Sequence, residues 1–296
     1  MIGSKFRNLL ARSVPQTLRC FVPESVYKHL YTQGVINVAL KNDKSFHLWT
    51  HGYDLENKIF WGGIEKCHEP LSMRIWLEIC TLIKPKEIWD IGANTGIYGI
   101  VAQIQSPVSN ITFFEPLKEC IRILEINLKL NGMKAVIHQV ALANYVGTSK
   151  IALNSSQDFG YAAGLGVESL PGHRSVEVEV NVAKAYLNHS QNLPELVKCD
   201  VETFEPNVLE GFGRVDFLNT IFLIEILNEK VAGELQSFFD PADFEFVNID
   251  DINSRFSRQE KLSPSFTYNF LIYPKSSSGP VNLLLNDLQL ELDRPT

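Results

Sequence analysis

The stretch EIWDIGANTGIYGI, residues 87–100, decides the fold, because an apolar run turns through glycines into a second apolar run. The first residues predict a buried strand, and the next helix is expected from about Thr95 to Gln105, with Thr95 as its N-cap and Pro107 beyond its end. A glycine-rich bend between a strand and a helix is typical of a site for a nucleotide-like ligand.

The spacing of the glycines separates the possible ligands. A Walker phosphate loop ends in Gly-Lys-Ser/Thr, whereas Gly96 is followed by Ile97 and Tyr98. A dinucleotide fingerprint reads G-x-G-x-x-G, and the interval from Gly92 to Gly96 is too long for it. The spacing therefore excludes a Walker loop and disfavours an NAD-linked dehydrogenase.

The remaining pattern, D-x-G-x-x-x-G, fits S-adenosylmethionine. Asp90 is placed to pair with the ammonium group of this ligand, and glycines Gly92 and Gly96 let the backbone approach its methionyl part. Asn94 is a local turn residue that also borders the same part. Glu115 follows Gly96 by 19 residues at the end of the next strand, where a carboxylate can accept both ribose hydroxyls.

Composition and charge are those of an ordinary globular enzyme. Of the 296 residues, 45% are hydrophobic and 21% are charged, and the formal net charge of -7 argues against a protein that grips a nucleic-acid backbone. The five scattered cysteines form no C-x-x-C pair, so we expect a cytoplasmic protein without a disulfide framework or zinc site. No apolar run approaches the about 20 residues of a membrane span.

The N-terminal segment is basic before Glu24 and carries Phe6, Leu9, Leu10 and Val14 at helical spacing. We expect a short helix that packs on the domain. A peripheral contact with a membrane surface through this segment is the alternative.

From about residue 86, strands alternate with helices, which predicts an α/β fold with a parallel sheet of about seven strands. Strands are expected at 87–91, 110–116, 134–140, 149–153, 175–182, 195–201, 221–227, 244–250 and 266–274. Helices are expected around 71–82, at 117–132 and near 205–212. We divide the chain into an N-terminal accessory or substrate-side region (1–85), an S-adenosylmethionine-binding domain (86–275), and a linker with a Leu-rich tail (276–296).

Taken together, these motifs resemble the FkbM family of S-adenosylmethionine-dependent methyltransferases over roughly residues 69–250. The segments that carry the resemblance are HEP (68–70), DIGANTGIYG (90–99), FFEPLKECIRILEINLKLNG (113–132), VALANYVGTSKIAL (140–153), VKCDVETFEPNVLEG (197–211) and LIEIL (223–227). The resemblance implies a Rossmann-like class I methyltransferase sheet with helices on both faces. It also implies S-adenosyl-L-methionine as the cofactor and methyl transfer to oxygen, often of a sugar or polyketide hydroxyl.

One residue departs from the family pattern. Thr203 stands where the family usually has Gly after D-V-E. If that position has a positive φ, Thr203 is strained there.

A hydroxyl acceptor needs a group that removes its proton. Asp200 is the first candidate, because it ends a central strand at the same sheet edge as Glu115, and it can instead hold the methionyl end of the cofactor. Glu202 either shares that site or caps the helix that begins near Glu205. His173, after a Gly-rich loop, is a third candidate base or a solvated loop residue.

The turn after the third strand is expected to recognise the adenine, and we assign Gln139 and Ala141 to this role. Asp200, Glu202 and Glu225 are hard oxygen ligands, but no spacing signature requires a metal, and none is predicted. The expected function is O-methylation of a hydroxyl on a sugar, glycan or other small metabolite. A catalytically degenerate binding or scaffold protein is the alternative, and a homo-oligomer is left open.

Overall fold

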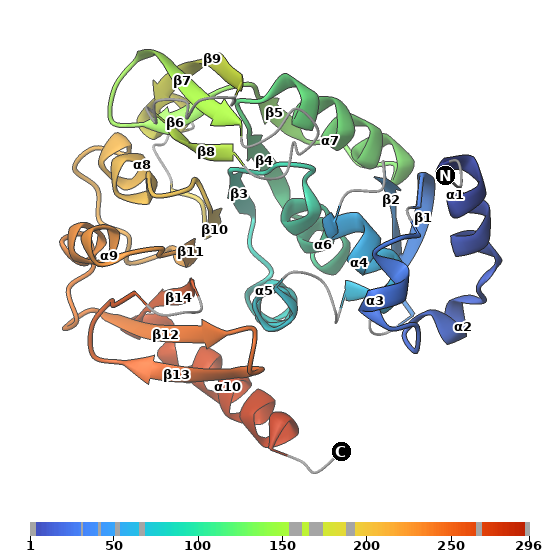
Figure 1. Cartoon of the computed structure of the whole chain (residues 1–296). Helices are drawn as coiled ribbons and strands as arrows, with labels where there is room; N and C mark the ends of the chain where they lie inside the picture. The colour runs from blue at the N-terminus through green and yellow to red at the C-terminus, as the bar shows by residue number, and fades with distance from the viewer. Residues whose placement is uncertain are drawn as a thin grey trace.

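The computed structural model of the protein describes residues 4–30, 32–40, 43–50, 54–64, 69–153, 162–165, 174–187, 193–264 and 268–293 (Figure 1). Within these ranges, an eight-stranded sheet lies at the centre, beside a four-stranded sheet and a two-stranded hairpin. Among the helices of the described ranges, none combines the length and the apolar character that crossing a membrane requires.

The central sheet confirms the expected α/β fold. Its strand order is β13-β12-β14-β11-β10-β3-β4-β5. The strands are β3 (Glu87–Ile91), β4 (Asn110–Phe114), β5 (Val136–His138), β10 (Leu196–Cys199), β11 (Ile221–Glu225), β12 (Phe244–Asp250), β13 (Arg255–Gln259) and β14 (Asn269–Pro274). Strands β5, β4, β3, β10 and β11 are parallel, whereas β14, β12 and β13 pair antiparallel. The predicted strands did not include β13, whose largely exposed residues carry no apolar signal.

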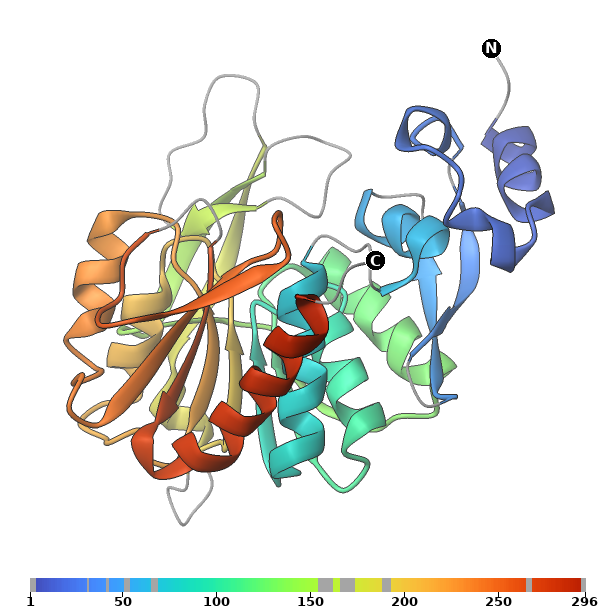
Figure 2. The ribbon, with the colours of Figure 1, turned by 90° about the horizontal axis from the view of Figure 1, so that it is seen from below.

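Different helices cover the two faces of this sheet (Figure 2). One face packs against α5 (Pro70–Ile83), α6 (Ile97–Gln105), α7 (Lys118–Leu130) and α10 (Ser278–Leu292), and the other against α8 (Glu205–Gly211) and α9 (Glu229–Gln236). Because side chains alternate along a strand, Leu196 of β10 joins the first core and Val197 joins the second. By the same alternation, Lys198 lies on the face of α5 and α6.

The start of α6 differs from the prediction. The N-cap is Gly96, with φ +83, rather than Thr95. The hydroxyl of Thr95 instead donates to Glu56 at 3.4 Å. The helix at 117–132 is confirmed as α7, with Asn131 at its C-cap and Gly132 following at φ +63.

A second sheet flanks the strand ends, in the order β6-β9-β7-β8. Its strands are β6 (Ala141–Ala143), β7 (Gly147–Leu153), β8 (Ala162–Leu165) and β9 (Arg174–Val182). The strictly alternating segment 175–182 is confirmed as a strand that pairs antiparallel with β7, and it also runs parallel to β6.

The C-terminal segment is helical where a linker was expected. Residues 275–277 form a 3-10 turn, and α10 begins directly at Ser278 with Pro280 in its first turn. Val281 and Leu285 of α10 are buried, and Arg74 of α5 forms an ion pair with Glu291. The Leu-rich tail therefore folds back onto the sheet.

The N-terminal region consists of α1 (Ser4–Ser13), α2 (Gln16–Arg19), α3 (Glu24–Tyr27), the hairpin β1 (Gly34–Ala39) and β2 (Ser45–Thr50), and α4 (Asp54–Gly62). The side-chain oxygens of Asn127 on α7 and of Asn131 at its C-cap accept the backbone N–H groups of Trp49 and His47, at 2.7 and 2.8 Å. These bonds attach the hairpin to α7. The expected short helix is α1, although its apolar residues Phe6, Leu9 and Leu10 are exposed.

Candidate functional site

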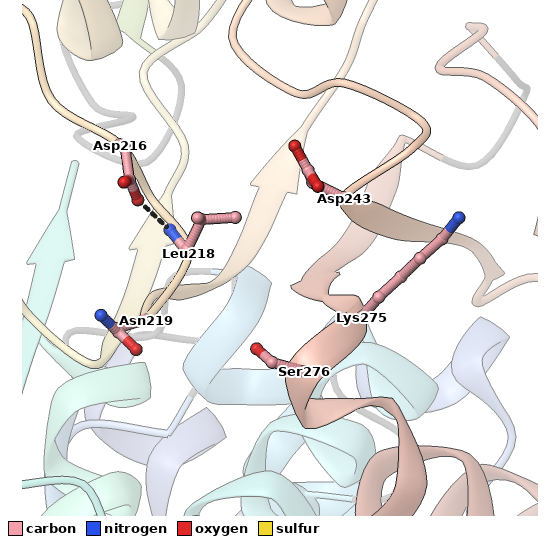
Figure 3. Close-up of a pocket in the computed structure, with 6 residues that line it drawn as sticks. All are labelled: Asp216, Leu218, Asn219, Asp243, Lys275 and Ser276. Atoms are coloured by element: carbon pink, nitrogen blue, oxygen red, sulfur yellow. Dashed lines mark hydrogen bonds between the residues drawn. The ribbon is translucent and has the colours of Figure 1, made fainter.

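A pocket of about 460 Å³ opens at the edge of the sheet where the parallel strands begin (Figure 3). Asp216, Leu218 and Asn219, which precede β11, line one side, and Lys275, which follows β14, lies on another. None of the predicted site residues that the structure describes lines this pocket. In parallel α/β sheets, ligands bind at the opposite edge, beyond the carboxyl ends of the strands.

At that opposite edge, the glycine-rich loop joins β3 to α6. Gly92, Asn94 and Gly96 have φ values of +77, +50 and +83, so three residues of this short loop are left-handed. A Cβ at Gly92 would lie 1.8 Å from the carbonyl oxygen of Asp200, and one at Gly96 would lie 2.1 Å from Leu124. Gly92 is therefore required by a backbone contact within the protein, and Gly96 by its left-handed φ, because the Leu124 side chain could move.

Asp90 lies one residue before the end of β3 and is buried. Its Oδ2 accepts the backbone N–H of Gly99 at 2.8 Å, so the carboxylate holds the first turn of α6. Burial raises the pKa of Asp90 to about 7, while the bond from Gly99 and the charge of Lys198 oppose that shift.

Glu115 follows β4 directly and faces the same loop. Its Oε2 accepts the N–H of Asn94 and its Oε1 the N–H of Leu117, both at 2.8 Å. Burial raises the pKa of this carboxyl to about 7, and the two backbone bonds oppose the shift only in part. Each carboxylate oxygen has a second lone pair, so the group can accept further donors.

The turn after β5 contains the two residues assigned to adenine. Gln139 is exposed, and Ala141 is buried at the start of β6. The ring of His138 stacks on Phe114, with centroids 5.2 Å apart, and lies 4.4 Å from the ring of Tyr186. Burial lowers the pKa of His138. The rings of Phe114, His138 and Tyr186 therefore border this turn.

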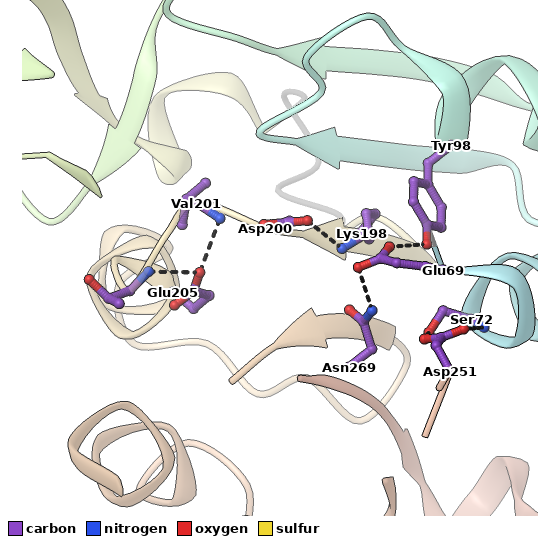
Figure 4. Close-up of polar contacts among 10 residues, drawn as sticks. Glu69, Ser72, Tyr98, Lys198, Asp200, Val201, Glu205, Asp251 and Asn269 are labelled. Atoms are coloured by element: carbon purple, nitrogen blue, oxygen red, sulfur yellow. Dashed lines mark hydrogen bonds and ion pairs between the residues drawn. The ribbon is translucent and has the colours of Figure 1, made fainter. Parts of the chain in front are cut away.

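Asp200 follows β10 beside the loop, since its N–H donates to the carbonyl of Ile91. The ammonium of Lys198 lies 3.1 Å from Asp200 Oδ2, and Lys198 is only 2% exposed (Figure 4). Burial alone lowers the pKa of Lys198, but the carboxylates of Asp200, Glu69 and Glu225 together raise it above its ordinary value. Lys198 is therefore a buried cation among carboxylates.

Glu69, from the start of α5, joins this group although sequence reasoning did not assign it to the site. Its Oε2 accepts the hydroxyl of Tyr98 at 2.6 Å, and its Oε1 accepts the Nδ2 of Asn269 at 2.7 Å (Figure 4). The segment HEP was noted for its family resemblance alone. Its acidic residue carried no local signal of a site, because its partners lie far away in the sequence.

Glu225, the last residue of β11, completes the cluster. One oxygen from each of Glu69, Asp200 and Glu225 lies within 4.8 Å of the others. Burial, followed by the negative charge of Asp200, raises the pKa of Glu225 to about 10. We call these three carboxylates and Lys198 the carboxylate cluster.

The turn after Asp200 is strained. Glu202 and Thr203 have φ values of +57 and +82, which confirms that Thr203 occupies a position suited to glycine. The N-cap of α8 is Phe204, and its side chain forms no capping bond. Glu205 instead accepts the N–H groups of Val201 and Thr203 through Oε1, at 3.0 and 3.3 Å.

The structure thus brings Asp90, Glu115 and Asp200 around one loop, together with Gly92 and Asn94. His173 lies outside the described residues, as does most of the segment 154–174, and its role stays a prediction.

Comparison with known proteins identifies related sequences and folds. Residues 90–259, more than half of the chain, match the family model described as the methyltransferase FkbM domain. No curated protein matches the chain.

Among solved structures, precorrin-6y C5,15-methyltransferase from Geobacter metallireducens is 12% identical over 68% of this chain and 86% of its own, with a TM-score of 0.36. The plantazolicin methyltransferase BpumL, in complex with SAH, is 13% identical over 77% and 81%, with a TM-score of 0.39. The tRNA (uracil-54, C5)-methyltransferase of Pyrococcus abyssi is 12% identical over 82% of this chain, with a TM-score of 0.43. The match spans 45% of that enzyme.

Proposed function

The chain belongs to the family of FkbM-domain methyltransferases, and we propose that it transfers a methyl group to a hydroxyl oxygen on a sugar, glycan or other small metabolite. The fold is the Rossmann-like class I methyltransferase fold, and S-adenosyl-L-methionine is the cofactor. The observation that supports an oxygen acceptor is the carboxylate cluster beside the glycine-rich loop, because a hydroxyl needs a base whereas a more nucleophilic acceptor does not.

The residues around the loop fit the cofactor. The buried carboxylate of Glu115 has spare lone pairs at the end of β4, where ribose hydroxyls would bind. Gly92, Asn94 and Gly96 would border the methionyl part, and Asp90 would hold the first turn of α6 toward it. These assignments are proposals, as are Gln139 and Ala141 for the adenine.

S-adenosyl-L-methionine supplies an electrophilic methyl group on a sulfonium. In the proposed step, the acceptor oxygen forms a C–O bond as the C–S bond breaks, and the electron pair of the broken bond stays on sulfur. We assign the hydroxyl proton to the carboxylate of Asp200. The ammonium of Lys198 fixes this carboxylate at 3.1 Å, so that it is oriented before the acceptor binds.

Glu202 is the second candidate for the base, since it lies two residues further along the same strained turn. His173 is the third, as a prediction from the sequence. If Asp200 is the base, Asp200→Asn should lower kcat by roughly 10²- to 10⁴-fold. The variant should change the affinity for S-adenosyl-L-methionine much less.

The test combines calorimetry with an assay of S-adenosylhomocysteine release over a panel of sugars and small hydroxyl compounds. Asp216→Asn, in the remote pocket at the opposite sheet edge, is the matched control. If the Asp200→Asn variant keeps its turnover, another residue must act as the base. Cofactor binding without turnover on any acceptor would favour the scaffold alternative. Metabolite profiling of a deletion strain, which seeks a species lighter by one CH₂, would then identify the natural acceptor.

A further inference from the structure

Among the described residues, two oxygen atoms at the carboxylate cluster have no hydrogen-bond partner. Asn269 is 2% exposed, and its Oδ1 is buried without a partner, as is Oε2 of Glu225. Asn269 and Glu225 are directly opposite each other in the pairing of β14 with β11, so their side chains stand on the same face. Figure 4 shows the amide of Asn269 directed toward Glu69 and Lys198.

With the Glu225 carboxyl ionised, as cation binding requires, both unpartnered atoms are acceptors. A buried acceptor without a partner is costly, so the arrangement calls for a donor or a cation between these groups. An amide oxygen and carboxylate oxygens are the hard ligands that Mg²⁺, Mn²⁺ and Ca²⁺ take. No histidine or cysteine belongs to this group of possible ligands among the described residues, which disfavours zinc.

The geometry and the charge agree with a divalent ion. Ligand oxygens lie at most roughly 5 Å apart around Ca²⁺ and roughly 4 Å apart around Mg²⁺. Those of Glu69, Asp200 and Glu225 lie within 4.8 Å, so binding of the smaller ion would draw them slightly closer together. With its groups ionised, the cluster has three negative charges, and Lys198 supplies one positive charge. One divalent cation would neutralise the remainder.

We propose that Glu69, Asp200 and Glu225, with the Oδ1 of Asn269, bind one divalent cation of the magnesium or manganese type. Tyr98 positions Glu69 for this role through its hydroxyl, and Lys198 positions Asp200. The role of this ion, though not its binding, rests on the proposed function. The ion would lie on the acceptor side of the site, hold the acceptor hydroxyl and make its proton easier to remove.

The test uses the full chain after treatment with a chelator. Mn²⁺ is titrated and followed by its free-ion electron paramagnetic resonance signal, and Mg²⁺ is then added as a competitor. We expect one Mn²⁺ per chain, displaced by Mg²⁺, and at least roughly tenfold weaker binding in Glu225→Gln, which preserves the shape of the side chain. Glu69→Gln should weaken binding similarly. The exposed Glu229→Gln, on α9, should bind as the wild type does.

Absence of Mn²⁺ binding, or equal affinity in wild type and Glu225→Gln, would overturn the inference. Melting temperatures establish that each variant is folded. A parallel titration with S-adenosyl-L-methionine separates the two proposals. Binding of the cofactor without binding of Mn²⁺ removes the metal site alone, whereas Mn²⁺ binding without cofactor binding supports the site and contradicts the proposed function.

Discussion

A Cβ atom on Gly92 would lie 1.8 Å from the carbonyl oxygen of Asp200, so the glycine-rich loop and the end of β10 are in direct backbone contact. Gly92→Ala should lower the free energy of unfolding by about 3 kcal/mol or more, because it combines a clash with a left-handed φ. Gly63 has a φ of +73 and nothing within 4 Å of an added Cβ, so Gly63→Ala should cost only about 1 kcal/mol. Urea denaturation of both variants measures the difference. Equal losses of unfolding free energy in the two variants would mean that the contact between Gly92 and Asp200 does not restrict the residue at position 92.

The carboxylate of Glu115 should contribute to the affinity for S-adenosyl-L-methionine. Glu115→Gln should weaken binding by about 1–3 kcal/mol, since an amide replaces a charged acceptor for the ribose hydroxyls. Isothermal titration calorimetry gives the Kd. Glu125→Gln, at an exposed position of α7, should leave it unchanged. A wild-type Kd in Glu115→Gln would remove Glu115 from the donor site.

Lys198 should matter strongly for stability. Lys198→Met removes a buried cation from three half-buried carboxylates, so we expect a loss of about 3 kcal/mol in the free energy of unfolding. Lys230 also pairs with a glutamate, but its side chain is 82% exposed, so Lys230→Met should cost less than about 1 kcal/mol. Denaturant titration compares the two. A Lys198→Met protein as stable as wild type would show that the cluster does not depend on this cation.

Replacement of Thr203 by glycine, the residue that the family usually carries there, should stabilise the protein. Thr203→Gly relieves a β-branched residue at φ +82, and we expect a gain of up to about 1 kcal/mol after the added entropy of the unfolded chain. Thr148→Gly, in β7 without a positive φ, should be destabilising. A loss in Thr203→Gly of the same size would contradict strain at this turn.

Glu205 should make stability depend on pH. Burial raises its pKa from 4.5 to about 7. Between these values the folded chain holds a proton that the unfolded chain has released, so the contribution of Glu205 to stability falls as the pH rises through this window. Urea denaturation across it should give a flatter profile for Glu205→Gln than for wild type. The exposed Glu260→Gln should follow the wild-type profile, and a Glu205→Gln profile as steep as wild type would count against the shifted pKa.

Much of the structure around the glycine-rich loop could be predicted, because it depends on local spacing. The strand 87–91, the glycine loop, Glu115 and the helix up to Asn131 and Gly132 follow from residue order within one α/β unit. The start of α6 could not be predicted this way. The left-handed Gly96 took the place of Thr95 as N-cap, and a tertiary contact with Glu56 engaged the threonine.

Most of the carboxylate cluster could not be predicted, because distant segments build it. Glu69 and Asn269 are 200 residues apart in the sequence, and no periodicity relates them. Lys198 did carry a signal: a lysine within an apolar strand indicates a buried partner, and Asp200, two residues on, is on the same face. The sequence analysis grouped Glu225 with Asp200 as oxygen ligands, but only the sheet register shows that Asn269 joins them.

Glu69 precedes the segment that matches the family model, and Asn269 follows it, yet the two side chains bond across the cluster. In a chimera that exchanged residues 90–259 between two family members, the donor loop, Asp200 and Glu225 would come from one parent. The residues at positions 69 and 269 would come from the other. Swapping the matched segment alone would therefore divide this polar network between two parent sequences, and a graft meant to keep the network intact has to include both flanks.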